Sequence, residues 1–160
     1  METRHLHLVI RFSDTMFGVG DVVEKHNDVV DRHGAVWLGK LGRTLALPRI
    51  EMLNKQITLN IPTFLYLVKG NRRKSTPYKA TIISISRDFP KKEKALIPPY
   101  YAEKKLLKFM NAWFKIGHIE QVEMSDLKNL KTINSIFPLE ETLQRSSSGY
   151  FLLHESKSIF

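Results

Sequence analysis

Three side chains suited to recognising a flat polar ring lie close together in this sequence. Trp37 stands in the run Gly34-Ala35-Val36-Trp37-Leu38-Gly39-Lys40, which follows a helix-like segment containing Asn27. An indole ring offers a stacking surface, an amide both donates and accepts hydrogen bonds, and an ammonium group attracts anions. Together these groups favour a binding site for a nucleobase. The alternative is that Trp37 is a core residue on a buried strand, where large aromatic side chains are usually found.

The formal net charge of +9 is concentrated in the middle third of the chain. Residues 61–120 hold thirteen Lys and Arg against four Asp and Glu, whereas residues 1–60 balance to +1 and residues 121–160 to −1. A local cationic excess with interleaved aromatic residues predicts a polyanion partner, and we expect nucleic acid. The alternative is an ordinary solvated face. The candidate phosphate-binding residues are Lys40, Arg43, Lys69, Arg72, Arg73, Lys74, Lys91, Lys92 and Lys94.

The elements that must position these residues begin with a half-buried strand from His5 to Phe12, whose apolar side chains alternate. A loop containing Phe17 follows, and a helix capped by Asp21 runs to His33 and ends at Gly34. We expect a short strand over Ala35 to Leu38. After these elements the pattern predicts a turn over Gly39 to Arg43 and a short helix over Pro48 to Gln56.

The basic third of the chain is predicted to form a hairpin. The strands are Thr63 to Val68 and Tyr78 to Ser86, and Arg72, Arg73 and Lys74 lie at the tip of the connecting loop. A proline-containing loop from Phe89 to Tyr101 then ends in the pair Tyr100-Tyr101. The remaining expected elements are a strand over Ala112 to Ile119, short helices over Met124 to Asn129 and Pro138 to Gln144, and a strand over Gly149 to His154.

This order of elements predicts a single α/β (α+β) domain over residues 1–160, in which short helices flank a small, twisted, barrel-like sheet. We find no internal repeat and no linker that would divide it. There is no long apolar run and no signal peptide, so a soluble protein without membrane contact is expected. The lack of cysteine fits a reducing cytoplasm.

No set of residues with the spacing of a catalytic or metal site stands out. The six histidines are scattered, and His5 and His7 share a strand face without a carboxylate at ligand spacing. The chain has neither a nucleophile elbow nor a phosphate-binding loop. We therefore expect a binding module rather than an enzyme, with no metal and no cofactor.

Two segments resemble the YTH/EVE branch of the PUA-like superfamily, whose domains read modified bases in nucleic acid. The first is Asn27 to Lys40, which resembles the helix and Gly-Val-Trp strand of YTH domains, with an Asn ten residues before the Trp. The second is Trp113-Phe114-Lys115-Ile116-Gly117-His118-Ile119, which resembles the late Phe-Lys-Ile strand. The order of elements agrees over roughly residues 6–120, and EVE-like modules of some McrB-type restriction proteins are similar.

The resemblance implies an aromatic cage for an N6-methyladenine-like or other modified base. Trp37 would form one wall with much of its ring exposed, and Asn27 would contact the base edge. Tyr100 or Tyr101 would form the opposite wall, and Phe17 is a further candidate. Trp113 is assigned to the core. Leu38 departs from the pattern, because YTH domains tend to have Ser or Thr after the Trp.

Three functions remain open at this point. The first is a modified-base reader that targets a larger prokaryotic defence protein, acting as a monomeric domain while the full-length protein oligomerises through other parts. The second is a PUA-like RNA-binding module that reads shape without dependence on modification. The third is a protein-interaction domain whose basic face meets an acidic partner. The sequence does not distinguish DNA from RNA.

Overall fold

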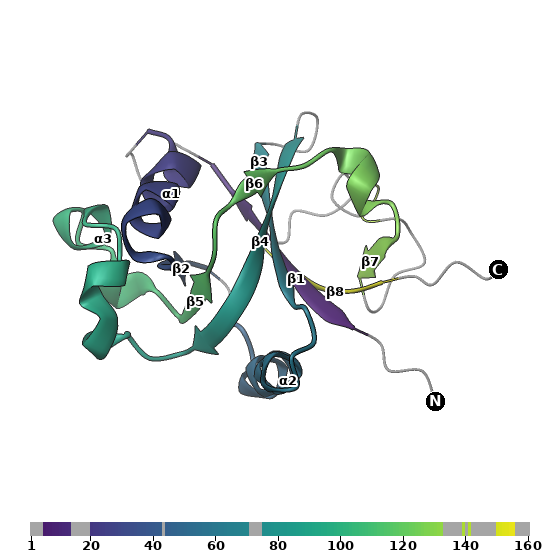
Figure 1. Ribbon diagram of the computed structural model, residues 1–160, viewed down its shortest axis with the longest axis horizontal. Coiled ribbons are helices and arrows are strands. Elements are labelled where there is room, and N and C mark those ends of the chain that lie inside the picture. The colour runs from purple at the N-terminus through teal and green to yellow at the C-terminus, as the bar shows by residue number, and fades with distance from the viewer. Residues whose placement is uncertain are drawn as a thin grey trace.

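The computed structural model describes residues 5–13, 20–42, 44–70, 75–132, 139, 141 and 150–155. Among them lie eight strands, β1 (Leu6–Phe12), β2 (Val36–Lys40), β3 (Phe64–Gly70), β4 (Ser75–Ser86), β5 (Ala112–Ile116), β6 (Glu120–Gln121), β7 (Leu130–Thr132) and β8 (Tyr150–Glu155). The helices are α1 (Val22–His33), α2 (Leu47–Thr58) and α3 (Tyr100–Glu103), with three short 3-10 turns η1 (Lys91–Leu96), η2 (Leu107–Phe109) and η3 (Met124–Leu127). Figure 1 shows these elements around one strongly twisted sheet.

The strands pair in the order β2-β5-β4-β3-β1-β8-β7, and β6 pairs with β4 beside this path. β1 and β3 are parallel, and the other pairs are antiparallel. β4 is shared by two parts of the sheet, because Ser75 to Thr81 pairs with β3 whereas Ile82 to Ser86 pairs with β5. A register shift between Ile82 and Ser84 marks the change of partner, and such irregularities bend a strand.

Helix α1 begins and ends where its sequence predicts. The Asp21 side chain accepts a hydrogen bond from the Glu24 backbone N–H at 3.0 Å, and Gly34 ends the helix in the left-handed conformation with φ 85°. Val22, His26 and Val29 are buried against the sheet, whereas His33 at the end of the helix is exposed.

The two faces of β2 and β5 belong to different clusters of buried side chains. Val36 and Leu38 face the main core with Phe114 and Ile116, and this core also collects residues of β1, β3, β4, α1 and α2. The alternating residue Trp37 faces outward into a second cluster beneath α3, as alternation along a strand requires. The sheet therefore curls around the main core, and α3 covers the outer face of its β2–β5 edge (Figure 1).

The expected fold class is confirmed: a mixed α+β domain with one curled sheet and short flanking helices. The boundaries differ mainly at β2, which continues through Gly39 and Lys40 although a turn was predicted there. Part of the predicted Phe89 to Tyr101 loop is helical, as η1 and the start of α3. The predicted helix over Pro138 to Gln144 lies almost wholly outside the described residues. Within the described part of the chain, no helix combines the length and the apolar character needed to cross a membrane.

Candidate functional site

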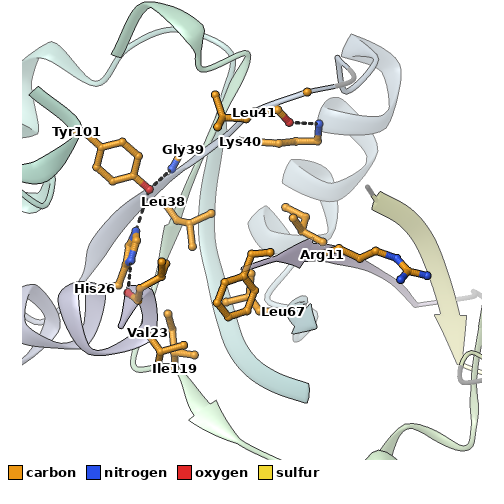
Figure 2. A pocket seen from close by; sticks show the side chains of 14 residues that line it. Arg11, Val23, His26, Leu38, Gly39, Lys40, Leu41, Leu67, Tyr101 and Ile119 are labelled. Carbon is orange, nitrogen blue, oxygen red and sulfur yellow. Dashed lines mark hydrogen bonds between the residues drawn. The ribbon is translucent and has the colours of Figure 1, made fainter. Parts of the chain in front are cut away.

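A cavity of about 190 Å³ lies between β1, α1 and β2 (Figure 2). Its walls are mainly apolar. The apolar side chains that line it are Ile10, Phe12, Val22, Val23, Leu38, Leu41, Leu67 and Ile119. A cavity of about 150 Å³ with similar walls holds a benzene ring, so this cavity has the size for one flat heterocycle. Figure 2 shows the side chain of Arg11, another residue at its edge, directed away from the other labelled side chains.

A short series of hydrogen bonds closes one wall of the cavity. His26 Nδ1 lies 2.8 Å from the Val22 carbonyl oxygen and therefore carries the ring proton, which leaves Nε2 to accept from the Tyr101 hydroxyl at 2.9 Å. The same hydroxyl oxygen accepts from the Gly39 backbone N–H at 3.0 Å. The series links α1, α3 and the edge strand β2, as Figure 2 shows.

Both side chains in this wall are uncharged at neutral pH. Burial lowers the pKa of His26 to about 4, although its bond to the Val22 carbonyl opposes the shift. Burial likewise raises the pKa of Tyr101 to about 12. The wall therefore presents neutral groups whose hydrogen bonds are already made.

Lys40 lies at this cavity and not on the basic surface. Its side chain is 3% exposed, and its Nζ donates to the Leu41 carbonyl at 3.1 Å. Lys40, which was predicted to bind phosphate, is buried in the free protein because β2 continues through residue 40. Alternation then places Lys40 on the same inward face as Val36 and Leu38.

The predicted cage residues are brought together, but they form a packed cluster. Trp37, Tyr100 and Tyr101 share it with Met110 and Trp113. The Tyr100 and Tyr101 rings stack with centroids 4.4 Å apart, and Tyr101 lies 5.3 Å from the Trp113 ring. Trp37 is only 4% exposed, so the expectation of an open ring is wrong. The assignment of Trp113 to the core is confirmed, since it is 1% exposed.

The close packing over β2 depends on Gly39. A Cβ atom at this position would lie 2.7 Å from Met110 Sδ and 3.1 Å from Tyr101 Cε1. The segment around α3 therefore approaches the backbone of β2 more closely than any other residue at position 39 would permit. This approach buries the aromatic side chains.

Asn27 does not present its amide to a binding site. Its Nδ2 donates to the Ile119 carbonyl at 2.9 Å, and its Oδ1 accepts from the Ile119 N–H at 2.8 Å. Both functional atoms are thus engaged with the backbone just after β5. In this conformation a backbone segment distant in sequence occupies the amide that was predicted to contact a base edge.

The basic candidates divide into three groups. Lys91, Lys92 and Lys94 are exposed on and around η1, where they can reach a phosphate backbone, and Lys69 is half-buried at the end of β3. Lys40 is buried, as described above. The remaining basic candidates lie outside the described residues: Arg43, Arg72, Arg73 and Lys74. The aromatic cage candidate Phe17 lies outside them too.

A second and more open pocket, of about 570 Å³, lies over the outer side of Trp37. It is lined by Trp37, Ser86, Asp88, Phe89, Pro90, Lys91, Lys92 and Glu93. The Glu93 carboxylate accepts from Lys115 Nζ at 2.8 Å. The pocket thus joins an aromatic floor to part of the exposed basic segment.

Neither the hydrogen bond between His26 and Tyr101 nor the place of Phe89 and Pro90 in the lining of the second pocket was predicted from the sequence. A signal for the pair was present, since a histidine in an apolar helix stripe requires a buried hydrogen-bond partner. A tyrosine in an apolar context requires one too. Nothing local showed that residues 75 positions apart would meet.

The chain belongs to the Pua-like family, whose model matches residues 8–160. PUA-like domains bind nucleic acids, so this membership supports a nucleic-acid partner. The match confirms the predicted superfamily and does not single out its YTH or EVE branch. No curated protein and no solved structure matches the chain.

Proposed function

We propose that this PUA-like domain binds unpaired nucleic acid and takes one modified base into the cavity between β1, α1 and β2. The observation that carries the proposal is the cavity itself, with a volume of about 190 Å³ and largely apolar walls. A base that leaves its stack loses a few kcal/mol, and burial of its ring against these walls offsets part of that loss.

The preference for a modified base follows from the chemistry of the walls. The His26 and Tyr101 side chains are already hydrogen-bonded to each other and to the backbone. An unmodified exocyclic amine entering the cavity would give up hydrogen bonds to water without full replacement, and this costs free energy. A methyl group has no such hydrogen bonds to lose.

The exposed lysines around η1 supply the electrostatic part of binding in this proposal. Lys91, Lys92 and Lys94 make no ion pair within the described part of the chain, so they are available to neutralise phosphates. The domain then acts by binding and not by catalysis. Its role as the targeting module of a larger prokaryotic defence protein is a further proposal that rests on the resemblance to EVE-like modules.

Filling the cavity tests the proposal. Val23→Phe places a ring in the cavity, whereas Val30→Phe makes the same change on α1 outside the cavity lining. Affinity is measured by fluorescence anisotropy for a single-stranded oligonucleotide with one N6-methyladenine and for its unmethylated counterpart, as DNA and as RNA. We expect the original chain and Val30→Phe to prefer the methylated strand, and Val23→Phe to lose that preference while keeping salt-sensitive binding.

The two alternative functions, a module that does not depend on modification and a protein-interaction domain, predict different results in the same binding experiment. Equal affinity for methylated and unmethylated strands, unchanged by Val23→Phe, would leave a PUA-like module that reads nucleic acid without the modification. No binding to either strand at low salt would overturn the nucleic-acid proposal and favour an acidic protein partner.

A further inference from the structure

Trp37, one of the residues that line this second pocket, carries a polar group without a hydrogen-bond partner among the described residues. The indole Nε1–H of Trp37 is buried and has no hydrogen-bond partner in the described part of the chain. Most buried donors in native proteins are satisfied, and those that are not call for an explanation. The nitrogen itself is covered, so an acceptor in the pocket would provide the missing partner once the side chains over Nε1 move aside.

The apolar part of the pocket is held in place by neighbouring rings. Phe89 packs edge-on against Trp113, with ring centroids 5.8 Å apart, and Pro90 follows it directly. Both residues are half-buried, so each offers part of its surface to a ligand. A fixed aromatic and prolyl surface of this kind suits the face of a planar ring.

The charges around the pocket favour an anion near its rim. Lys91 and Lys92 are exposed and unpaired within the described residues, whereas the Glu93 carboxylate is held by Lys115. Asp88 also lines the pocket, and its backbone N–H and C=O bond to the Ser86 hydroxyl at 3.1 and 3.0 Å. Apart from the exposed Asp88 carboxylate, the pocket groups without a partner among the described residues are one donor and two cations, which fit a ligand with ring acceptors and a phosphate on the lysine side of the pocket.

We propose that this pocket is a second nucleotide site, which takes an unpaired nucleotide next to the one whose base enters the cavity. The inference rests on the proposed nucleic-acid binding. The second base packs on Phe89 and Pro90 and offers an acceptor to Trp37 Nε1–H, and its phosphate lies between Lys91 and Lys92. The ligand of the domain is then a strand of at least two nucleotides rather than an isolated modified base.

The two tryptophans of the chain allow a direct test by NMR. The indole N–H signals of Trp37 and Trp113 are assigned with a Trp37→Phe variant and followed during titration with a single-stranded trinucleotide that carries N6-methyladenine, and with the methylated mononucleotide. We expect the trinucleotide to shift the Trp37 signal downfield as its N–H gains an acceptor. The mononucleotide should leave it in place, and the Trp113 signal reports whether the ring cluster around Phe89 also responds.

Charge removal at the rim gives an independent readout. The variant with Lys91→Gln and Lys92→Gln should bind the trinucleotide on the order of tenfold more weakly, because the phosphate between these positions loses both cations. The mononucleotide should lose less affinity than the trinucleotide, because it does not occupy the second site. The matched control carries Lys55→Gln and Lys128→Gln, two exposed lysines elsewhere, and should behave like the original chain.

The results distinguish failure of the second nucleotide site from failure of the proposed function. If the trinucleotide binds and Val23→Phe removes its methyl preference while the Trp37 signal stays fixed, the second site is wrong and the cavity proposal stands. If no oligonucleotide binds, both fail.

Discussion

At the scale of single residues, the two polar side chains of the cavity wall, His26 and Tyr101, already have hydrogen-bond partners. His26 shows this best, because one ring nitrogen bonds within α1 and the other bonds to Tyr101. Its complete burial disfavours the charged ring. The neutral form is therefore part of the folded structure, and protonation opposes folding.

The stability of the domain should consequently fall in mild acid. The pKa of His26 is about 4 in the folded chain against 6.5 in the unfolded one, so the unfolded state binds the proton first as the pH falls. Stability from this residue is complete above pH 6.5 and is lost on the way down to about pH 4, at up to about 1.4 kcal/mol per pH unit. Urea unfolding across this range measures the slope.

His26→Gln should flatten that slope, whereas the exposed His118→Gln should not. An unchanged slope in His26→Gln would show that another group governs the acid sensitivity.

Trp37 is expected to act as a core residue in thermodynamic measurements. Because the ring is 4% exposed, Trp37→Ala should lower the free energy of unfolding by about 3–5 kcal/mol. Trp37→Phe keeps most of the packing and should cost clearly less. Denaturant titration of both variants gives the comparison, and a Trp37→Ala chain as stable as the original would mean that the ring is not packed as described.

Some of these residue roles could be predicted from the sequence and others could not. Asp21 and Gly34 end their helix by local chemistry, which a short window of sequence contains. The core position of Trp113 is local in the same sense. The prediction that β1 is half-buried is wrong, because His7 to Ile10 are all buried and a second cluster packs on Val9. The burial of Trp37 depends on α3, and the hydrogen bonds of Asn27 depend on the segment after β5. The sequence near residues 27 and 37 does not indicate that these distant segments pack there.

At the scale of elements, three side-chain amides attach helices to strands. Asn27 on α1 bonds both backbone groups of Ile119, and Asn54 on α2 bonds both backbone groups of Ile85 on β4. Gln56 on α2 does the same for Leu6 at the start of β1. Each amide forms hydrogen bonds with a backbone N–H and C=O at a strand end or irregularity, where the neighbouring strand does not bond these groups.

Asn27→Ala should therefore reduce stability more than binding selectivity. It leaves the backbone groups of the buried Ile119 without their partners, which costs about 1–3 kcal/mol. The exposed Asn129→Ala is the matched control and should be nearly neutral. Thermal melting supplies the first quantity and the methylated oligonucleotide pair the second. Loss of selectivity at unchanged stability would restore Asn27 to the recognition site.

At the scale of the whole molecule, the charge excess of the middle third lies partly on the exposed segment around η1. Binding through this segment should depend steeply on salt, with a slope of roughly −0.7 to −0.9 per phosphate neutralised. Reversal of Lys92 and Lys94 to Glu should weaken methylated and unmethylated strands equally. The control reverses Lys55 and Lys128. Affinity that stays flat between low and moderate salt would contradict a phosphate interface.

The pairing of β1 has a consequence for how fast the chain can fold. β1 lies between β3, its parallel neighbour, and β8, with Leu6 opposite His154. A parallel pair and a pair between such distant strands both require a large loss of chain entropy before their contacts form. The α1, β3 and β4 segments can gain local contacts early, whereas the insertion of β1 must wait for strands far along the chain. Folding of this domain should therefore be slow for its size, and β8 should be among the last strands to become protected from amide hydrogen exchange.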